Sequence, residues 1–308
     1  MSNQTKKVVI AGGTGFIGMN LAKFLTQKKF DVVLISRHNS SKKGPWKHVL
    51  WDGHDLGEWA KELEGADILV NLAGQSVDCI KTPDNCDTIL RSRVDATKVL
   101  GKALRIIKSP PTIWIQMSTA HIYGDPADYV CDETASLGYG LATHVGLEWE
   151  KAFYQAVLPK MRKVIFRTSF VLGQKDGAMK TLRFLASIGL GGTIGNGKQG
   201  MSWIHEEDMN RLFHEAMIDE NIHGTYIATA PNPVSNKLFM KTLRQTIGIP
   251  FGLPSPAWLV KIGAHFLFNT DPELALYGRY CKSKRLTQNI FKFKYPTLEL
   301  SFKNLYNK

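Results

Sequence analysis

A glycine-rich segment near the N-terminus limits what this chain can fold into more than any other part of the sequence. Val8-Val9-Ile10-Ala11 is typical of a short buried strand, and Gly12, Gly15 and Gly18 follow it before an amphipathic helical pattern. Gly12 permits a tight turn, Gly15 lets the backbone approach a ligand, and Gly18 lets the helix pack closely, while the helix N-terminus offers unpaired N–H groups to phosphate. Because a second apolar strand, Asp31–Ser36, comes next, the segment predicts a dinucleotide-binding turn rather than an ordinary glycine-rich loop. The predicted contacts in this turn are Gly12, Gly13, Thr14, Gly15, Phe16, Ile17 and Gly18.

The end of the second predicted strand indicates which dinucleotide fits. Sites specific for NAD usually end this strand with an acidic residue that accepts hydrogen bonds from the adenosine ribose. Here the strand ends in Ser36-Arg37-His38. A carboxylate would repel a 2′-phosphate, whereas the Arg37 guanidinium can pair with it through two hydrogen bonds and the Ser36 hydroxyl can donate another. The sequence therefore predicts NADP (NADPH) as the cofactor, with a solvated Arg37 as the alternative.

Composition excludes several classes of protein. The chain has 308 residues, 44% of them hydrophobic, which is enough for one large domain or one domain with a lobe. No apolar run approaches the ~20 residues of a membrane span, and the polar residues before Val8 do not resemble a signal peptide. The cysteines, Cys79, Cys86, Cys131 and Cys281, lack metal-binding spacing and are expected to be free thiols. We expect a cytoplasmic protein without a metal site and without a membrane partner.

The net charge of +12 is concentrated toward the C-terminus. Basic residues in 279–308 alternate with aromatic ones, including Tyr280, Phe291 and Phe302. This pattern occurs in nucleic-acid-binding surfaces, but more often the aromatic residues belong to a core and the lysines to its solvated rim. We therefore expect no nucleic-acid partner, and the charge suits an anionic cofactor and anionic substrates.

Short apolar segments alternate with helical patterns through the first 230 residues, which predicts a parallel sheet. The expected strands are Val8–Ala11, Asp31–Ser36, His48–Trp51, Asp67–Leu72, Thr112–Ser118, Lys163–Ser169 and Thr225–Thr229. The expected helices are Phe16–Lys28, Asp87–Ile107, Ala142–Leu158, Ala178–Ile188 and Glu206–Ile218. We predict an α/β fold: a Rossmann-type doubly wound parallel sheet with a small, mainly helical C-terminal lobe. Residues 1–175 and about 205–230 would form the cofactor-binding domain, and 176–204 and 231–308 the substrate lobe.

Further motifs carry a family resemblance. They are Asn71-Leu72-Ala73-Gly74, Ser92-Arg93 with Thr97, Ser118-Thr119-Ala120 leading to Tyr123-Gly124, Gly195-x-Gly197-x-Gln199, and Ser202-Trp203-Ile204-His205. With these motifs the chain resembles the extended short-chain dehydrogenase/reductase superfamily almost from end to end. It is most similar to the atypical bacterial branch of NAD(P)-dependent epimerase/dehydratase proteins.

The resemblance implies roles for particular residues. Cofactor contacts are implied at Leu72, Ala73, Gly74, Arg93 and Ser118, the catalytic hydroxyl at Thr119, and substrate contacts at Tyr123, Gln199 and His205. The substrate would lie between the carboxyl edge of the sheet and the lobe, and a homodimer is implied through the fourth and fifth helices of the wider superfamily. The sequence departs from the branch between Cys79 and Asp87 and at Ile122, both near the expected substrate pocket. The identity of the substrate therefore stays open.

The catalytic pair of standard members is missing. That pair is Tyr-x-x-x-Lys, in which the lysine charge lowers the pKa of a phenol that otherwise titrates near ~10. An alignment on Trp149-Glu150 places Ala142 at the tyrosine position and Gly146 at the lysine position. An alignment on Tyr139 instead places Thr143 at the lysine position, so neither alignment has a lysine there.

Three side chains remain as candidates for the chemistry. Thr119 can polarise a substrate oxygen, Tyr139 can act as a displaced acid on the same helical face, and His144 can titrate near neutral pH. Two function classes stay open. One is an NADP-dependent oxidoreductase or epimerase-like enzyme acting on a small polar carbonyl or alcohol, including sugar-derived ones, which the glycine-rich loop Gly189–Gly197 favours. The other is a non-catalytic NADPH-binding or redox-sensing protein, which the missing pair favours.

Overall fold

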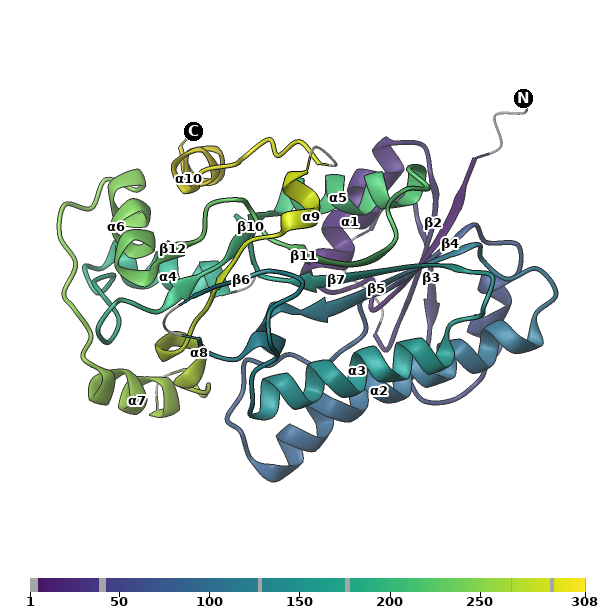
Figure 1. The fold of residues 1–308 in the computed structure, drawn as a ribbon, viewed down its shortest axis with the longest axis horizontal. Helices are drawn as coiled ribbons and strands as arrows, with labels where there is room; N and C mark the ends of the chain where they lie inside the picture. Colours follow the sequence, from purple (N-terminus) through teal and green to yellow (C-terminus); the bar gives the residue numbers. More distant parts are fainter. Residues whose placement is uncertain are drawn as a thin grey trace.

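A seven-stranded parallel sheet forms the centre of the molecule, with the strand order β11-β7-β5-β4-β1-β2-β3 (Figure 1). The computed structural model describes residues 5–38, 43–126, 129–174, 178–266, 268–288 and 291–307. The strands are β1 (Lys7–Ala11), β2 (Asp31–Ser36), β3 (Lys47–Leu50), β4 (Ile68–Asn71), β5 (Ile113–Thr119), β7 (Arg162–Thr168) and β11 (Gly224–Ala228). Every predicted strand of the parallel sheet is thus confirmed, with ends that differ by one residue where they differ.

Helices cover both faces of this sheet, which confirms the doubly wound Rossmann-type fold. Helices α1 (Phe16–Gln27) and α5 (Glu206–Ile218) lie on one face, and α2 (Pro83–Ile106) and α3 (Leu141–Ala156) on the other (Figure 1). The short 3-10 helix η1 (Glu58–Leu63) packs with the second pair. Side chains alternate along each strand, so that Val8 and Ile10 enter one core while Val9 and Ala11 enter the other.

Helix α2 begins earlier than the sequence pattern predicts. Its N-cap is Thr82, whose hydroxyl accepts a hydrogen bond from Asn85 N, and Pro83 occupies the first helical position. A threonine cap followed by proline is a favourable helix start, because proline has no N–H to leave unpaired. The expected start at Asp87 was wrong because the apolar periodicity begins only after this capped first turn.

The C-terminal lobe has its own apolar cluster, to which Trp203, Phe239 and Phe302 contribute. The elements of this region are β8 (Phe170–Leu172), α4 (Ala178–Ser187), β9 (Gly200–Met201), β10 (Trp203–His205), β12 (Val234–Ser235), α6 (Asn236–Thr246), α7 (Ala257–Phe266), α8 (Glu273–Leu276) and α10 (Leu298–Tyr306). Helix α9 (Lys284–Thr287) instead packs on β11, and its Leu286 belongs to the core of the sheet. The expectation that tail aromatics belong to a core is confirmed for Phe291 and Phe302, which are buried. The proposed division into two domains stays a prediction.

The C-terminal tail, residues 279–308, also pairs with a strand near the end of β5. Strand β13 (Tyr280–Cys281) pairs in parallel with β6 (Val130–Cys131), close to the 3-10 helix η2 (Ala120–Tyr123) that follows β5. Among the helices of the described residues, none combines the length and the apolar character that crossing a bilayer requires.

The strand order fixes where a ligand can bind. Chain order reverses between β1 and β4, which leaves a crevice at the carboxyl ends of the strands. The turn after β1, the end of β4 and the end of β5 all meet at this edge.

Candidate cofactor-binding and active site

The turn after β1 has the geometry of a phosphate cradle. Gly12 has φ +73°, and a Cβ on it would lie 2.8 Å from Ala73 N, so only glycine fits where β1 and β4 end side by side. A Cβ on Gly18 would lie 2.6 Å from Gly13 O, which accounts for the close packing of α1 on the turn. By contrast, a Cβ on Gly15 would meet only Gly12 O, at 3.6 Å. Gly15 therefore faces open space, where a ligand can approach the backbone.

Within the described residues, no side chain caps the N–H groups in the first turn of α1. Gly15 is the N-cap residue and supplies no side-chain cap, and no acidic residue stands in the first turn. Phe16 and Ile17 begin the helix, and the Phe16 ring packs against Gly173 after β8. Thr14 is only partly exposed beside them. Free N–H groups and the positive end of the helix dipole suit a pyrophosphate, so these residues fit a dinucleotide.

Buried amide groups hold the end of β4 in place. Asn71 Oδ1 accepts a hydrogen bond from Ala73 N at 3.0 Å, and Asn71 Nδ2 donates to Thr97 Oγ1 at 3.0 Å and to Gln116 Oε1 at 3.1 Å. Because each group of the Asn71 side chain is used, the Leu72-Ala73-Gly74 turn has little freedom. It lies directly against Gly12 on the other side of the crevice.

Arg93 of α2 stands next to this turn with most of its donors free. Its guanidinium stacks on Trp149 at 5.1 Å, and a Cβ on Gly74 would lie 3.0 Å from its Cζ. Within the described residues it makes one hydrogen bond, from Nη1 to Ile89 O at 2.9 Å. Burial lowers the pKa of Arg93 to about 10, so the group is cationic at neutral pH. It can therefore bind an anionic group in the crevice.

A buried polar network lies behind the end of β5. Ser118 Oγ donates to Glu150 Oε1 at 2.6 Å, and Arg167 binds both oxygens of Glu150 at 2.9 and 2.8 Å. Arg167 Nη1 also donates to Tyr123 Oη at 2.9 Å. Burial raises the pKa of Tyr123 to about 12, so its hydroxyl stays protonated at neutral pH.

This network corrects two predicted contacts. The predicted cofactor contact at Ser118 and substrate contact at Tyr123 are 3% and 1% exposed, and their hydroxyls bind protein groups. Both side chains support the site from behind. The sequence analysis missed Glu150 and Arg167 as members of the site. A charged residue inside the apolar strand Lys163–Ser169 was the signal that could have found Arg167.

Thr119 ends β5 with a hydroxyl that can still donate. It is the N-cap of η2, and its Oγ1 accepts a hydrogen bond from His121 N at 3.1 Å. No acceptor for the Thr119 hydroxyl hydrogen stands among the described residues. A hydroxyl held in place by one accepted bond and free to donate another is suited to bind a substrate oxygen.

Helix α3 closes the position where the superfamily carries lysine. Gly146 is buried, and a Cβ on it would lie 3.3 Å from both Thr119 Cγ2 and Ile122 Cγ1. Such a distance is tighter than ordinary van der Waals contact. A side chain at position 146 would therefore have to displace Thr119 or Ile122 where α3 packs on η2.

Tyr139 and His144 lie away from this packing. Tyr139 is 95% exposed and precedes the N-cap Gly140, whose φ of 91° takes the chain out of the helical conformation. The expectation that Tyr139 shares a face of the helix was therefore wrong. His144 is also exposed, in the first turn of α3. A further histidine, His121, is partly buried, and burial together with the Arg279 charge lowers its pKa to about 3.

The predicted substrate contacts Gln199 and His205 have structural partners. His205 is 2% exposed, its Nδ1 accepts from Glu207 N at 3.0 Å, and its ring stacks 3.9 Å from that of Tyr295. Burial lowers the pKa of His205 to about 4. Gln199 Nε2 donates to Ile194 O at 3.1 Å and Ala275 O at 2.9 Å, so it joins two loops of the lobe. The structure does not bring these two side chains together with Thr119.

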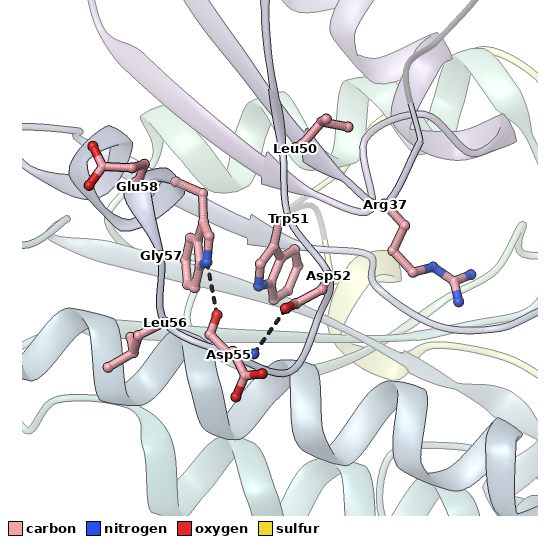
Figure 2. A pocket seen from close by; sticks show the side chains of 9 residues that line it. Arg37, Leu50, Trp51, Asp52, Asp55, Leu56, Gly57 and Glu58 are labelled. Carbon is pink, nitrogen blue, oxygen red and sulfur yellow. Dashed lines mark hydrogen bonds between the residues drawn. The ribbon is translucent and has the colours of Figure 1, made fainter.

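A pocket of about 370 Å³ lies at the ends of β2 and β3 (Figure 2). It is lined by Arg37, Leu50, Trp51, Asp52, Asp55, Leu56, Gly57, Glu58 and Trp59. The Trp51 and Trp59 rings lie 5.0 Å apart and form an apolar wall. Asp52 Oδ1 accepts from His54 N and Asp55 N at 2.8 and 2.9 Å, and these bonds lower the pKa of Asp52. The pocket thus joins an aromatic wall, a carboxylate and a guanidinium.

Arg37 is exposed and reaches across the crevice. Its Nη2 donates to Gln75 Oε1 at 3.0 Å, which links the end of β2 to the turn after β4. Ser36 is 5% exposed, and its hydroxyl lies 2.9 Å from His38 O and 2.7 Å from His48 Nε2. The expected donation from Ser36 to a 2′-phosphate does not fit this geometry, because local acceptors already use the hydroxyl. Ser36 instead shapes the turn that carries Arg37.

No group of three or more His, Cys, Asp and Glu side chains in the described part of the chain could hold a metal ion. The cysteines at positions 79, 86, 131 and 281 are free thiols, as expected.

Comparison with known proteins places this site in a family. The model of the "NAD dependent epimerase/dehydratase family" matches residues 8–226. The epimerase family protein YfhF of Bacillus subtilis (strain 168) is 31% identical over 306 residues, which cover 97% of each chain. The human epimerase family protein SDR39U1 is 29% identical over 97% of this chain and 99% of its own. The crystal structure of human SDR39U1 (isoform 2) with NADPH has a TM-score of 0.86 at 27% identity, over 97% of this chain and 99% of that one. The chain therefore belongs to the NAD dependent epimerase/dehydratase family.

Proposed function

We propose that this protein binds NADP(H) and reduces or oxidises a small polar carbonyl or alcohol compound, including sugar-derived ones. The observation that carries this proposal is the Thr119 hydroxyl, which is fixed at the end of β5 with a hydrogen left to donate. The crevice with the free α1 N-terminus lies along the same sheet edge. Substrate would enter between this edge and the C-terminal lobe.

The glycine turn supports the binding of a nicotinamide dinucleotide. Its open face at Gly15 and the uncapped start of α1 suit the pyrophosphate, and the Arg93 guanidinium adds a nearby positive charge. The Leu72-Ala73-Gly74 turn would line the other side of the cofactor. The bound NADPH of human SDR39U1, which has the same fold, supports this assignment.

Arg37 supports a preference for NADP over NAD. The pocket beside it has aromatic walls of a size that suits adenine, and Asp52 Oδ2 is available to accept from the adenine amino group. Arg37 would exchange its bond to Gln75 for a bidentate contact with the 2′-phosphate. It is the only cationic side chain that lines this pocket in the described residues, so the preference depends on it.

The residues present suggest a simple division of tasks. When bound, the cofactor supplies or accepts a hydride. Thr119 would bind the substrate oxygen and polarise the carbonyl, which places positive character on the carbon that receives the hydride. Because the tyrosine and lysine are missing and Tyr123 is buried, the proton that completes the reduction would come from water in the open crevice.

A second function is favoured by the packing at Gly146. The catalytic lysine position is closed, Tyr139 is exposed outside the helix, and the pKa of His121 is far below neutral. These features suit a protein that binds NADPH as a ligand or redox signal without turnover.

One assay separates the two functions. NADPH absorbance is followed with the wild-type protein and a panel of aldehydes, ketones and nucleotide sugars. Two matched variants are compared. Thr119→Val removes the hydroxyl at the site, and Thr26→Val removes a hydroxyl in α1 that donates to Ala22 O. The enzyme proposal expects NADPH consumption that Thr119→Val lowers at least tenfold and Thr26→Val leaves unchanged. Tight NADPH binding without consumption across the panel would support the binding function instead.

A further inference from the structure

The chain segment before β13 is hydrogen-bonded to the loop after η2, which follows the predicted catalytic strand β5. Arg279 Nε donates to Gly124 O at 2.6 Å, and Gly278 N donates to Asp125 Oδ1 at 2.7 Å. Gly124 directly follows η2, which begins after Thr119. A residue from the far end of the sequence is thus brought beside the site.

Arg279 is a nearly buried cation that forms no ion pair within the described part of the chain. It is 9% exposed, and its two terminal guanidinium nitrogens have no partner among the described residues. The carboxylate whose charge acts on it, Asp125, uses Oδ1 for Gly278 N and forms no ion pair with it. Cys131 and Cys281, the other groups that act on its charge, are free thiols.

Three other partly buried arginines of this chain use more of their donors, whereas Arg93 and Arg244 also make one side-chain hydrogen bond each. Arg167 binds both oxygens of Glu150, and Arg162 Nη1 donates to three carbonyl oxygens. Arg285 donates to Thr225 O and His223 O and stacks on an aromatic ring. Arg279 donates once, from Nε. A buried charge without a counterion or full hydrogen bonding costs folding free energy. An anionic ligand bound at the two unpaired nitrogens of Arg279 would offset that cost.

The terminal nitrogens of Arg279 are also within reach of a ligand. Among the described residues, the two terminal nitrogens of Arg279 have no partner but are not fully enclosed by protein atoms. Solvent therefore touches them. Burial, together with the positive charge of Arg279, lowers the pKa of His121, so that this imidazole is neutral. A neutral imidazole has one N–H to donate and no partner for it in the described residues.

The length of η2 indicates how far the loop that binds Arg279 lies from Thr119. Thr119 caps the start of η2, and Gly124, which holds Arg279, follows its end. Four residues of a 3-10 helix span about 8 Å at ~2 Å per residue. Thr119 and the backbone oxygen that binds Arg279 therefore stand at the two ends of one short helix, and their separation is on the scale of a molecule of a few carbon atoms.

We propose that Arg279, assisted by His121, binds an anionic group of the substrate, a carboxylate or a phosphate. The substrate class then narrows to small carbonyl or alcohol compounds that carry such a group several bonds from the reacting carbon. This inference rests on the proposed function for the role of Thr119. Anion binding itself depends only on Arg279 and its surroundings.

Calorimetric titration of the full-length protein with anions tests the proposal. The protein is first saturated with NADP⁺, which keeps phosphate out of the glycine turn, and is then titrated with malonate, inorganic phosphate or the neutral analogue malonamide. Arg279→Gln is compared with Arg91→Gln, which removes the same charge from an exposed arginine on α2 that pairs with Asp87. We expect malonate or phosphate to bind wild type and Arg91→Gln, at least tenfold more weakly to Arg279→Gln, and malonamide to bind none of them. The anion that binds more tightly identifies the group as carboxylate or phosphate.

Two results would overturn the proposal: wild type that binds neither anion, or Arg279→Gln that binds as wild type does. If Arg279→Gln loses its folded structure, His121→Ala takes its place, because it leaves the Arg279–Gly124 bond intact. It should weaken anion binding at least threefold, and unchanged binding would contradict the assignment. The NADP⁺ titration of each protein is read separately. Loss of nucleotide binding by wild type refutes the proposed cofactor, whereas normal nucleotide binding without anion binding refutes only the role of Arg279.

Discussion

Gly146 of α3 packs directly against Thr119 at the end of β5, so that a Cβ on Gly146 would lie 3.3 Å from Thr119 Cγ2. By the alignment on Trp149-Glu150, the first position would correspond to the catalytic lysine of the superfamily that the chain resembles, and the second to its catalytic hydroxyl. Here the hydroxyl is present and the lysine position is filled by helix packing. Whatever chemistry the site performs must therefore proceed without the lysine.

A lysine at position 146 should destabilise the protein rather than restore the pair. Gly146→Lys inserts a side chain where Thr119 and Ile122 leave no room, and overpacking typically costs ~1–3 kcal/mol. Ala142→Lys, on an exposed position of the same helix, should change the free energy of unfolding by less than ~0.5 kcal/mol. Urea denaturation of both variants measures the difference. Equal stabilities would contradict the packing described for α3.

The Glu150–Arg167 pair should be far more important for stability than its exposed counterpart on the same helix. Their side chains are 10% and 12% exposed, and Glu150→Gln leaves the buried Arg167 charge without its counterion, at a cost of ~3–5 kcal/mol. Glu148→Gln removes an exposed partner of Lys151 and should cost less than ~1 kcal/mol. Chemical denaturation checks both values. A small effect of Glu150→Gln would mean that the network behind β5 is not structurally required.

His205 should make the protein less stable in mild acid. Burial lowers its pKa from 6.5 to about 4 in the folded state. The unfolded chain therefore binds a proton that the folded chain does not, and stability is lost as the pH falls from 6.5 toward 4. The full loss from this group is on the order of 3 kcal/mol. His205→Asn keeps an N-cap side chain and should reduce the slope of unfolding free energy against pH, while His144→Asn, at an exposed position, should not. Identical slopes of unfolding free energy against pH for wild type and His205→Asn would contradict this role of His205.

Two glycines of the cofactor turn should respond differently to alanine. A Cβ at Gly15 meets only Gly12 O, at 3.6 Å, so Gly15→Ala should fold with nearly unchanged stability yet obstruct the pyrophosphate and weaken NADPH binding at least tenfold. A Cβ at Gly18 would lie 2.6 Å from Gly13 O, so Gly18→Ala should lower the melting temperature. Thermal melts with and without NADPH measure both effects. Unchanged NADPH affinity in Gly15→Ala would show that the nucleotide does not approach this backbone.

The parallel sheet could be predicted from the sequence because each of its strands is an apolar run between turn signals. Two-residue strands such as β6 and β13 could not, since their pairing depends on contacts between residues distant in sequence. The start of α3 shows a similar limit. Gly140 has a positive φ, which places Tyr139 outside the helix although the spacing of residues suggested a shared face.

Much of the cofactor turn could be predicted, because its glycines are needed for backbone reasons that are local in sequence. The side-chain contacts were harder to predict. Ser36 lies within hydrogen-bond distance of His48 Nε2, and His205 stacks on Tyr295. Such partners become visible only when distant segments meet. The sequence did not indicate a role for Arg279 either, because its contact with Gly124 joins two segments that are distant in sequence. Arg279 belongs to a basic tail whose aromatic residues were correctly expected to be buried.

The most direct test of the account is a paired calorimetric titration of NADPH and NADH into wild type and Arg37→Ala, with Arg91→Ala as the charge-matched control. We expect NADPH to bind wild type and the control at least tenfold more tightly than NADH, a difference of about 1.4 kcal/mol. Arg37→Ala should bind the two nucleotides equally, because the 2′-phosphate loses the one cationic side chain that lines the pocket among the described residues. Equal affinities in wild type would refute the assignment of Arg37, and binding of neither nucleotide would contradict the account of the glycine turn as a dinucleotide site.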